Sequence, residues 1–253
     1  MTEVELIVIG ITAVAGGAVN ALAGGGTLLT FPVLTAVGIP TVAANITNTV
    51  ALCPGYLGGT LAQLRDLSGD KRKLWLLGSA GALGGVVGGI LLLNTGEQTF
   101  RRLVPYLILL AAGLLVVKEP LHRWHRRRVG VGRATHNEPV GTVLLVLLAS
   151  IYGGYFGGGL SVIVLAVLAL MAHDSLTRLN ALKQVISFCV NFAAAVFFLF
   201  SGKVVWQATL VMAAGALIGG IIGGRLADSV RPQVLRWMVV VVGLIVSIVY
   251  FVQ

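Results

Sequence analysis

Residues 16–27 read GGAVNALAGGGT and residues 153–161 read GGYFGGGLS, and each stretch contains three consecutive glycines inside an apolar region. A glycine in a helix costs about 1 kcal/mol relative to alanine, so three in a row favour an interruption of the helix. Within hydrocarbon, non-helical backbone is tolerated only where protein or a water-filled cavity surrounds it. We therefore expect two breaks that face a cavity, each followed by a short helix, over 27–37 and 160–172.

The composition around these breaks is that of a membrane protein. The 253 residues are 57% hydrophobic and 11% charged, with a mean hydropathy of +0.96, whereas soluble domains contain about 25% charged residues. These values exclude a soluble globule, a disordered chain, collagen and a disulfide framework. Membrane β-barrels show weak alternation rather than long apolar runs. The predicted fold class is all-α, a polytopic membrane protein.

A helix needs about 20 residues to cross the hydrocarbon core of a bilayer. The first apolar run follows the acidic residues Glu3 and Glu5 instead of a basic segment, so we expect it to be a span and not a cleaved signal peptide. The full-length spans are predicted over 4–22, 44–63, 73–94, 100–118, 140–156, 179–201, 206–226 and 233–252.

The second half of the sequence repeats the first. The paired features are the glycine runs at 24–26 and 157–159, Asn45 and Asn180, GGVVGG at 84–89 and GGIIGG at 219–224, Gln98 and Gln233, and Arg101 and Arg236. Small residues recur in many membrane helices, so the polar pairs strengthen the match. We therefore predict a first membrane repeat over 1–118, a basic cytoplasmic linker over 119–139 and a second membrane repeat over 140–253.

Basic residues orient the predicted spans, because Lys and Arg concentrate in cytoplasmic loops. Placing the linker inside a cell (inner or plasma) membrane puts both termini outside and leaves only Arg101, Arg102 and Lys203 among the basic residues there. The two halves then have opposite orientations. Inverted-topology repeats are typical of secondary transporters that work by alternating access. A duplicated membrane enzyme or scaffold is the alternative.

Each predicted short helix begins at a glycine run and presents unpaired N–H groups together with the positive end of its dipole. Such a helix start is a ready anion site, and two of them related by the repeat predict one site at the midplane. The hydroxyls of Thr27 and Ser161 add donors. Close helix packing, which glycine also permits, is the alternative. The candidate residues are Gly24, Gly25, Gly26, Thr27, Gly157, Gly158, Gly159 and Ser161.

Polar residues in the next helix of each half complete the candidate substrate site: Asn45, Thr47, Asn48, Asn180, Lys183 and Asn191. Lys183 is the one charge inside its segment and could attract an anion. Its alternative is snorkelling to the nearby membrane boundary. For Asn48 and Asn191 the alternative is hydrogen bonding between helices.

The sequence contains no metal-ligand cluster and no nucleophile with a base inside the membrane, so we expect neither enzyme activity nor a metal or cofactor. The net charge is +9, and the basic residues lie between apolar segments and not on a polar face. This placement argues against nucleic acid as a partner. The expected partners are a small anion and the lipid bilayer. The sequence leaves open a coupling proton or Na⁺, and a homo-oligomer.

The motifs resemble a known family. AGGGTLLTFPVL at 23–34, Gly38 and AANITNT at 43–49 look like the first repeat of the sulfite exporter TauE/SafE family, also called the 4-toluenesulfonate uptake permease group. FGGGLS at 156–161, LNALK at 179–183 and Asn191 are similar to its second repeat. The resemblance covers nearly the whole chain.

The resemblance implies a transporter of sulfite, sulfonates or related small organic anions. The alternative function is an anion channel that uses the same hydrogen-bond donors. One departure concerns Pro32, which follows the first glycine run: its counterpart near Leu165 and Ala166 lacks the proline that the family often has. The positions matching the motif are Gly24, Gly25, Gly26, Pro32, Asn45, Thr47, Asn48, Gly157, Gly158, Gly159, Asn180 and Lys183.

Overall fold

The computed structural model describes residues 1–22, 24–67, 71–129, 139–171, 175–225 and 232–252. These residues form ten α-helices and one short 3₁₀ helix, and contain no strand, which confirms the all-α prediction. The elements are α1 (Glu3–Leu22), α2 (Thr27–Ala36), α3 (Thr41–Ala62), η1 (Leu64–Asp66), α4 (Lys71–Asn94), α5 (Glu97–Val129), α6 (Pro139–Tyr155), α7 (Leu160–Met171), α8 (Leu176–Leu199), α9 (Trp206–Arg225) and α10 (Pro232–Val252).

The helix boundaries lie close to those that the apolar runs predict, with one large difference at the basic stretch 119–139. Helix α5 continues through the first half of this stretch to Val129. Leucine and arginine favour helix, so the chain need not unwind where it becomes charged. Residues 130–138 of the predicted linker lie outside the described residues.

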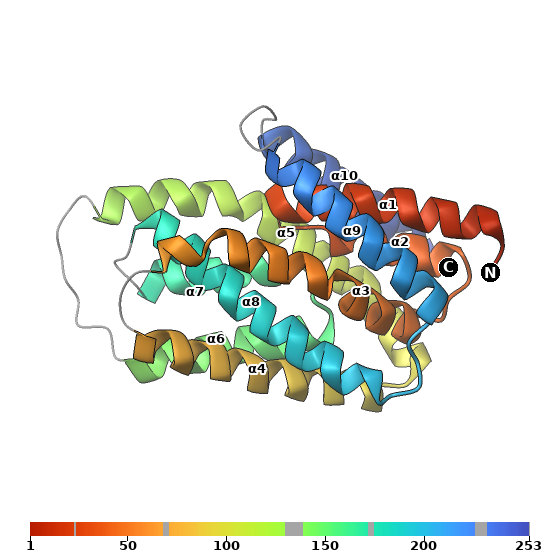
Figure 1. Ribbon diagram of the computed structural model, residues 1–253, viewed down its shortest axis with the longest axis horizontal. Coiled ribbons are helices and arrows are strands. Elements are labelled where there is room, and N and C mark those ends of the chain that lie inside the picture. Colours follow the sequence, from red (N-terminus) through yellow and green to blue (C-terminus); the bar gives the residue numbers. More distant parts are fainter. Residues whose placement is uncertain (23, 68–70, 130–138, 172–174, 226–231, 253) are drawn as a thin grey trace.

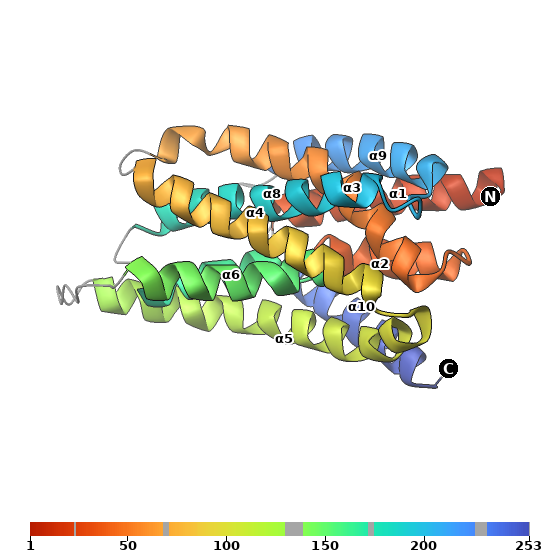
Figure 2. The same cartoon turned by 90° about the horizontal axis from the view of Figure 1, so that it is seen from below.

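The helices pack as a bundle in which elements far apart in sequence lie side by side (Figures 1 and 2). Helix α1 packs along α9, α4 packs along α6, and α3 packs against both α8 and α9. The N- and C-terminal ends of the chain lie at the same end of the bundle. Each half therefore contributes to the packing of the other.

Glycines form the closest of these helix contacts. A Cβ added at Gly85 would collide with the Val190 carbonyl of α8, and one added at Gly88 would collide with the Ile151 carbonyl of α6. In the second GGxxGG run, a Cβ at Gly219 would collide with the Val14 carbonyl of α1. Removing the side chain lets two helix backbones approach closely. At these positions the structure therefore supports packing as the role of glycine.

The described helices are suited to a membrane by length and composition. Four are long and apolar enough to cross a bilayer, within Glu3–Asn20, Lys71–Asn94, Glu97–Val116 and Thr177–Leu199. The shorter apolar helices are Thr27–Ala36, Val140–Tyr155, Leu160–Leu170, Trp206–Ile222 and Trp237–Phe251. Large apolar side chains such as Ile11, Leu83 and Ile248 are exposed, as expected on surfaces that face lipid. The number of complete crossings and their orientation stay predictions.

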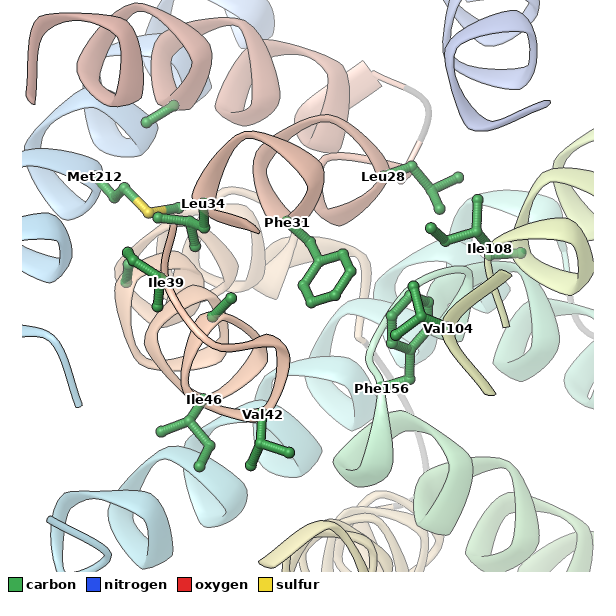
Figure 3. Close-up of a cluster of buried hydrophobic side chains, with 14 of the residues drawn as sticks. Leu28, Phe31, Leu34, Ile39, Val42, Ile46, Val104, Ile108, Phe156 and Met212 are labelled. Carbon is green, nitrogen blue, oxygen red and sulfur yellow. The ribbon is translucent and has the colours of Figure 1, made fainter. Parts of the chain in front are cut away.

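The largest buried cluster surrounds the middle of α2 (Figure 3). Phe31 on α2 meets Phe156, which directly follows α6, edge to face with ring centroids 5.6 Å apart. Val104 and Ile108 of α5 complete this part of the cluster. The contact joins one half of the chain to the other beside the second glycine run.

Candidate functional site

The first glycine run separates α1 from α2. Gly24 has a φ of +83°, which residues with a Cβ rarely adopt, and its N–H bonds to the Val19 carbonyl at 3.1 Å. Helix α2 then begins at Thr27. Within the described part of the chain, no acceptor bonds to the N–H groups of Gly25, Gly26 or Thr27. The described residues therefore leave three buried N–H donors without an acceptor at the start of α2.

The second glycine run separates α6, which ends at Tyr155, from α7, which begins at Leu160. The Tyr152 hydroxyl donates to the Gly158 carbonyl at 2.8 Å and holds the run against the last turn of α6. Among the described residues, no acceptor bonds to the N–H groups of Gly158, Gly159 or Ser161. This break thus resembles the first in offering unpaired donors where a helix begins.

The two breaks meet. A Cβ added at Gly24 would lie 3.2 Å from the Ser161 Cβ and 3.6 Å from its Oγ. Ser161 is buried at the start of α7, so the first break lies directly against the second short helix. A Cβ added at Gly25 would face Leu115 and Val239, whereas one added at Gly26 would meet the Gly16 carbonyl and Asn20. The start of α2 is therefore packed closely against α1, α5 and α10.

Helix α3 holds both breaks through asparagines one turn apart. Asn45 is fully buried, and its Nδ2 donates to the Tyr155 carbonyl at the end of α6 at 2.9 Å. Asn48 accepts from the Thr30 hydroxyl, which also bonds to the Gly26 carbonyl at 3.1 Å. Helix α3 is thereby tied to the second break directly and to the first through Thr30.

One polar atom at this place lacks a partner. The Oδ1 of Asn45 is buried and accepts no hydrogen bond from the described residues. Because Oδ1 and Nδ2 belong to one planar amide, this acceptor also lies at the end of α6, beside the second break. A buried acceptor without a donor costs about 1–3 kcal/mol, which a bound water or ligand would offset.

The remaining nominated residues have other partners. The Thr47 hydroxyl accepts from the Val205 N–H at 3.0 Å and anchors the segment before α9. Lys183 Nζ donates to Asn180 Oδ1 at 3.2 Å, and both side chains are half-buried. The amide of Asn191 donates to the Ser187 carbonyl of its own helix at 2.8 Å. This bond lies within α8, so it is not the bond between helices that the alternative for Asn191 expects.

The sequence of almost the whole chain identifies its family. The family model of the sulfite exporter TauE/SafE matches residues 8–250. The chain belongs to the sulfite exporter TauE/SafE family. The family assignment confirms the resemblance carried by the two glycine motifs. It also makes the protein a multi-pass membrane protein related to transporters.

Curated relatives of this TauE/SafE protein carry general names. A "Probable membrane transporter protein" of Haemophilus influenzae is 29% identical over 234 residues, covering 90% of this chain and 88% of its own. The Escherichia coli K12 "Probable membrane transporter protein YfcA" is 25% identical over 239 residues, covering 93% and 85%. A Sinorhizobium "Probable membrane transporter protein ORF9" is likewise 25% identical, covering 94% and 89%. No solved structure matches the chain.

The TauE/SafE chain also contains a cavity that the motifs do not reveal. It has a volume of about 600 Å³ and lies between α2, the start of α5 and α10. None of the residues that the sequence nominates for substrate binding lines it. We call it the α2–α10 cavity.

Sequence reasoning missed three residues that shape the site. Thr30 links Asn48 to the first break, and Tyr152 holds the second glycine run. Glu97 accepts from the N–H and hydroxyl of Thr41 and from the Val42 N–H at 3.2 Å, which caps the start of α3. The spacing of Thr30 four residues after Gly26 is a usable signal, because a helical Thr hydroxyl can bond the carbonyl one turn back. No local signal identifies Glu97 as the cap of a helix so distant in sequence.

Proposed function

We propose that this TauE/SafE protein is a secondary transporter of small sulfur-containing or organic anions, such as sulfite and sulfonates. The observation that supports the proposal is the contact of Gly24 with Ser161, which brings together two breaks whose N–H groups have no described acceptor. Helix starts with free N–H groups attract anions through hydrogen bonds and through the helix dipole. The site needs no buried cation to do so.

The proposed ligand lies between the two glycine runs. Its oxygens accept from the amides of Gly25, Gly26, Gly158 and Gly159, and the hydroxyls of Thr27 and Ser161 add donors. Lys183 on α8 supplies attraction through its positive charge. An oxyanion with several acceptor oxygens matches a site that is mostly made of donors. Sulfite and sulfonate groups have this chemistry.

The unpaired Oδ1 of Asn45 adds a requirement to the ligand. The Oδ1 acceptor favours a ligand that carries a proton on oxygen or nitrogen, because a fully deprotonated oxyanion cannot donate a hydrogen bond to it. We therefore include monoprotonated anions, such as hydrogen sulfite, and sulfonates that carry a hydroxyl or amine group. A bound water that bridges Asn45 to the anion serves the same purpose.

For the mechanism we propose alternating access between two inverted repeats, over 1–118 and 140–253. The packing supports this division. If α1 to α5 are matched in order with α6 to α10, each of two helix contacts between the halves has a matching contact. The contact of α1 with α9 corresponds to that of α6 with α4, and the contact of α2 with α10 corresponds to that of α7 with α5. In the proposed cycle one repeat rocks against the other around the anion. The close approach of Gly24 to Ser161 then corresponds to a closed state.

The proposed setting is a cell membrane with the 119–139 stretch in the cytoplasm and both termini outside. The two termini lie at the same end of the bundle, which agrees with both being on one side of the membrane (Figure 1). Arg101 and Lys203 then face the outer side. The proposal covers import and export alike, and a proton, Na⁺ or no coupling ion.

Flux into liposomes tests the function. Purified protein is reconstituted, and uptake of sulfite, methanesulfonate and taurine is measured beside acetate and chloride. A transporter gives saturable uptake and counterflow of at least one sulfur anion, whereas a channel gives unsaturated flux without counterflow. Absence of any protein-dependent anion flux would overturn the proposal.

The variant Lys183→Ala tests the proposed attraction within that assay. Its matched control is Lys203→Ala, which removes an exposed lysine beside the start of α9. We expect about tenfold less uptake for Lys183→Ala, since losing a charge-assisted contact costs roughly 1.5 kcal/mol or more. Equal uptake by the two variants would remove Lys183 from the site.

A further inference from the structure

One side of helix α8 is polar from its second turn to its middle. Polar residues recur there every three or four positions: Asn180, Lys183, Gln184, Ser187 and Asn191. The exposed apolar residues Phe192, Val196 and Leu199 mark the side that faces lipid. Ser187 precedes Val196 by nine residues, which is about two and a half helical turns, so the two lie on opposite sides of the helix. The polar side of α8 therefore faces into the bundle.

Contacts with two neighbouring helices border this polar side. On one flank α8 packs against α4, where a Cβ added at Gly81 would lie 3.4 Å from Ile186. On the other flank it packs against α3, where the Gln184 carbonyl accepts from the Thr60 hydroxyl at 3.2 Å. The polar side of α8 consequently lies in the angle between α3 and α4, away from the surrounding lipid.

The exposure of these polar side chains falls along the helix. Asn180, Lys183 and Gln184 are half-buried although they face inward, whereas Ser187 and Asn191 are buried. Side chains on the inner side of a helix keep accessible surface only where the bundle is open beside them. The bundle is therefore open along the first turns of α8 and closes at Ser187.

The hydroxyl at this point of closure has no hydrogen bond. Ser187 is fully buried, and its Oγ has no partner among the described residues. A serine hydroxyl inside a helix commonly bonds the carbonyl one turn back, which Ser187 does not do. Buried polar groups are normally hydrogen-bonded, so an unpartnered one indicates a ligand or water that binds there.

We propose that the polar side of α8 lines an entrance through which the anion reaches the glycine breaks, and that the Ser187 hydroxyl binds the anion where this entrance closes. The inference rests on the proposed function. A hydroxyl donates to an oxyanion directly or through a bridging water. Helix α8 contains no Asp or Glu that would repel an anion, and it packs against α3 and α7, which both border the breaks.

The entrance belongs to the second repeat and opens at the start of α8, on the proposed cytoplasmic side. Pairing Asn45 with Asn180 places Leu52 of α3 at the position of Ser187. Leu52 is buried and has no hydroxyl, so the first repeat lacks an equivalent group. We therefore expect the two sides of the membrane to differ in how deeply a polar entrance reaches.

Cysteine accessibility tests the entrance without a transport assay. The native cysteines are replaced by Cys53→Ala and Cys189→Ala, and Gln184→Cys, Ser187→Cys, Ser150→Cys or Val196→Cys is added singly. Inverted membrane vesicles, which present the predicted cytoplasmic side, are treated with the charged reagent sulfonatoethyl methanethiosulfonate. Because only a solvated thiolate reacts, Gln184→Cys and Ser187→Cys should react about tenfold faster or more than Ser150→Cys and Val196→Cys.

The outcomes of this labelling decide the two parts of the proposal. Methanesulfonate should slow the reaction of Ser187→Cys, as expected for an anion bound there. Reaction at position 184 without reaction at position 187 would remove Ser187 from the entrance. Reaction of neither, or reaction only from the outer side, would overturn the entrance itself.

Flux measured in the otherwise native chain tests the role of the hydroxyl. Ser187→Ala should raise the KM for sulfonate flux about two- to tenfold, the effect of one lost neutral hydrogen bond. Ser150→Ala is the matched control: its hydroxyl is also buried without a described partner, but it faces α4, where a Cβ added at Gly84 would lie 2.5 Å from the Ser150 Cβ. Equal KM values for the two variants would contradict binding at Ser187.

Failure of this inference is distinguishable from failure of the proposed function. Flux without labelling at positions 184 and 187 would leave the transporter and reject the entrance. Labelling at both positions in a protein that carries no anion flux would reject the transporter and leave a polar entrance on α8.

Discussion

The variant Gly24→Ala tests whether the two glycine breaks touch. A Cβ at position 24 would lie 3.2 Å from the Ser161 Cβ, so one of the two breaks must shift by a few tenths of an ångström. Gly38 provides a matched control, because its φ of +87° is similar to the +83° of Gly24 and a Cβ there would meet no atom within 4 Å. Both variants pay the backbone cost of a left-handed residue, about 1–2 kcal/mol.

The contact with Ser161 adds a cost that only Gly24→Ala pays. Overpacking a tight interior site costs about 1–3 kcal/mol. Gly24→Ala should therefore be less stable than Gly38→Ala by about that amount, and Ser161→Gly in the same chain should recover most of the difference. Each kcal/mol corresponds to about 2–4 °C in Tm for a chain of this size. Thermal unfolding in one detergent compares the native protein, the single variants and the double variant.

Transport provides a second measurement on the same set of variants. If the breaks form the anion site, Gly24→Ala lowers sulfonate flux per folded molecule and Gly38→Ala does not. Equal Tm losses in the two glycine variants, without recovery by Ser161→Gly, would refute the contact. Equal losses of flux would remove the first break from the transport site even if the contact exists.

Three other contacts lead to predictions of the same kind. Asn45→Ala leaves the Tyr155 carbonyl without its donor and should cost about 1–3 kcal/mol, whereas the exposed Asn94→Ala should cost little; unfolding of both measures this. Thr30→Val removes the hydroxyl that joins Asn48 to the first break and should destabilise by a similar amount, with Thr12→Val, whose hydroxyl bonds the Val8 carbonyl of its own helix, as its control. Glu97→Ala should cost about 1 kcal/mol as a lost cap and increase hydrogen exchange in the first turn of α3.

The helix positions were accessible from sequence because apolar runs end at strong local signals. The glycine runs, Pro40 and the basic clusters mark the ends of helices without reference to distant residues. Helix α3 shows where this reasoning stops. It begins at Thr41, three residues before the predicted start at 44, and the carboxylate of Glu97 from another helix caps it. A contact across such a sequence distance leaves no local trace.

The sequence predicts which residue types form the candidate site, but it predicts less well which atoms they bond to. Polar residues in apolar helices predict buried hydrogen bonds, and Asn45 and Asn48 do form them. Their partners, the Tyr155 carbonyl and the Thr30 hydroxyl, depend on how the two halves pack. The same holds for the α2–α10 cavity, because volume between two helices depends on their crossing and not on either sequence alone.

The hydrogen bonds of α3 define what must change when the bundle opens. Asn45 holds the end of α6, and Asn48 holds the start of α2 through Thr30, so the two breaks cannot separate without losing one of these bonds. A single hydrogen bond contributes about 0.5–1.5 kcal/mol net, which is small enough for a ligand to offset. A monoprotonated anion that accepts from the amides of the breaks and donates to the Asn45 Oδ1 would supply that energy. We therefore expect α3 to be the element through which binding at the breaks is coupled to movement of the repeats.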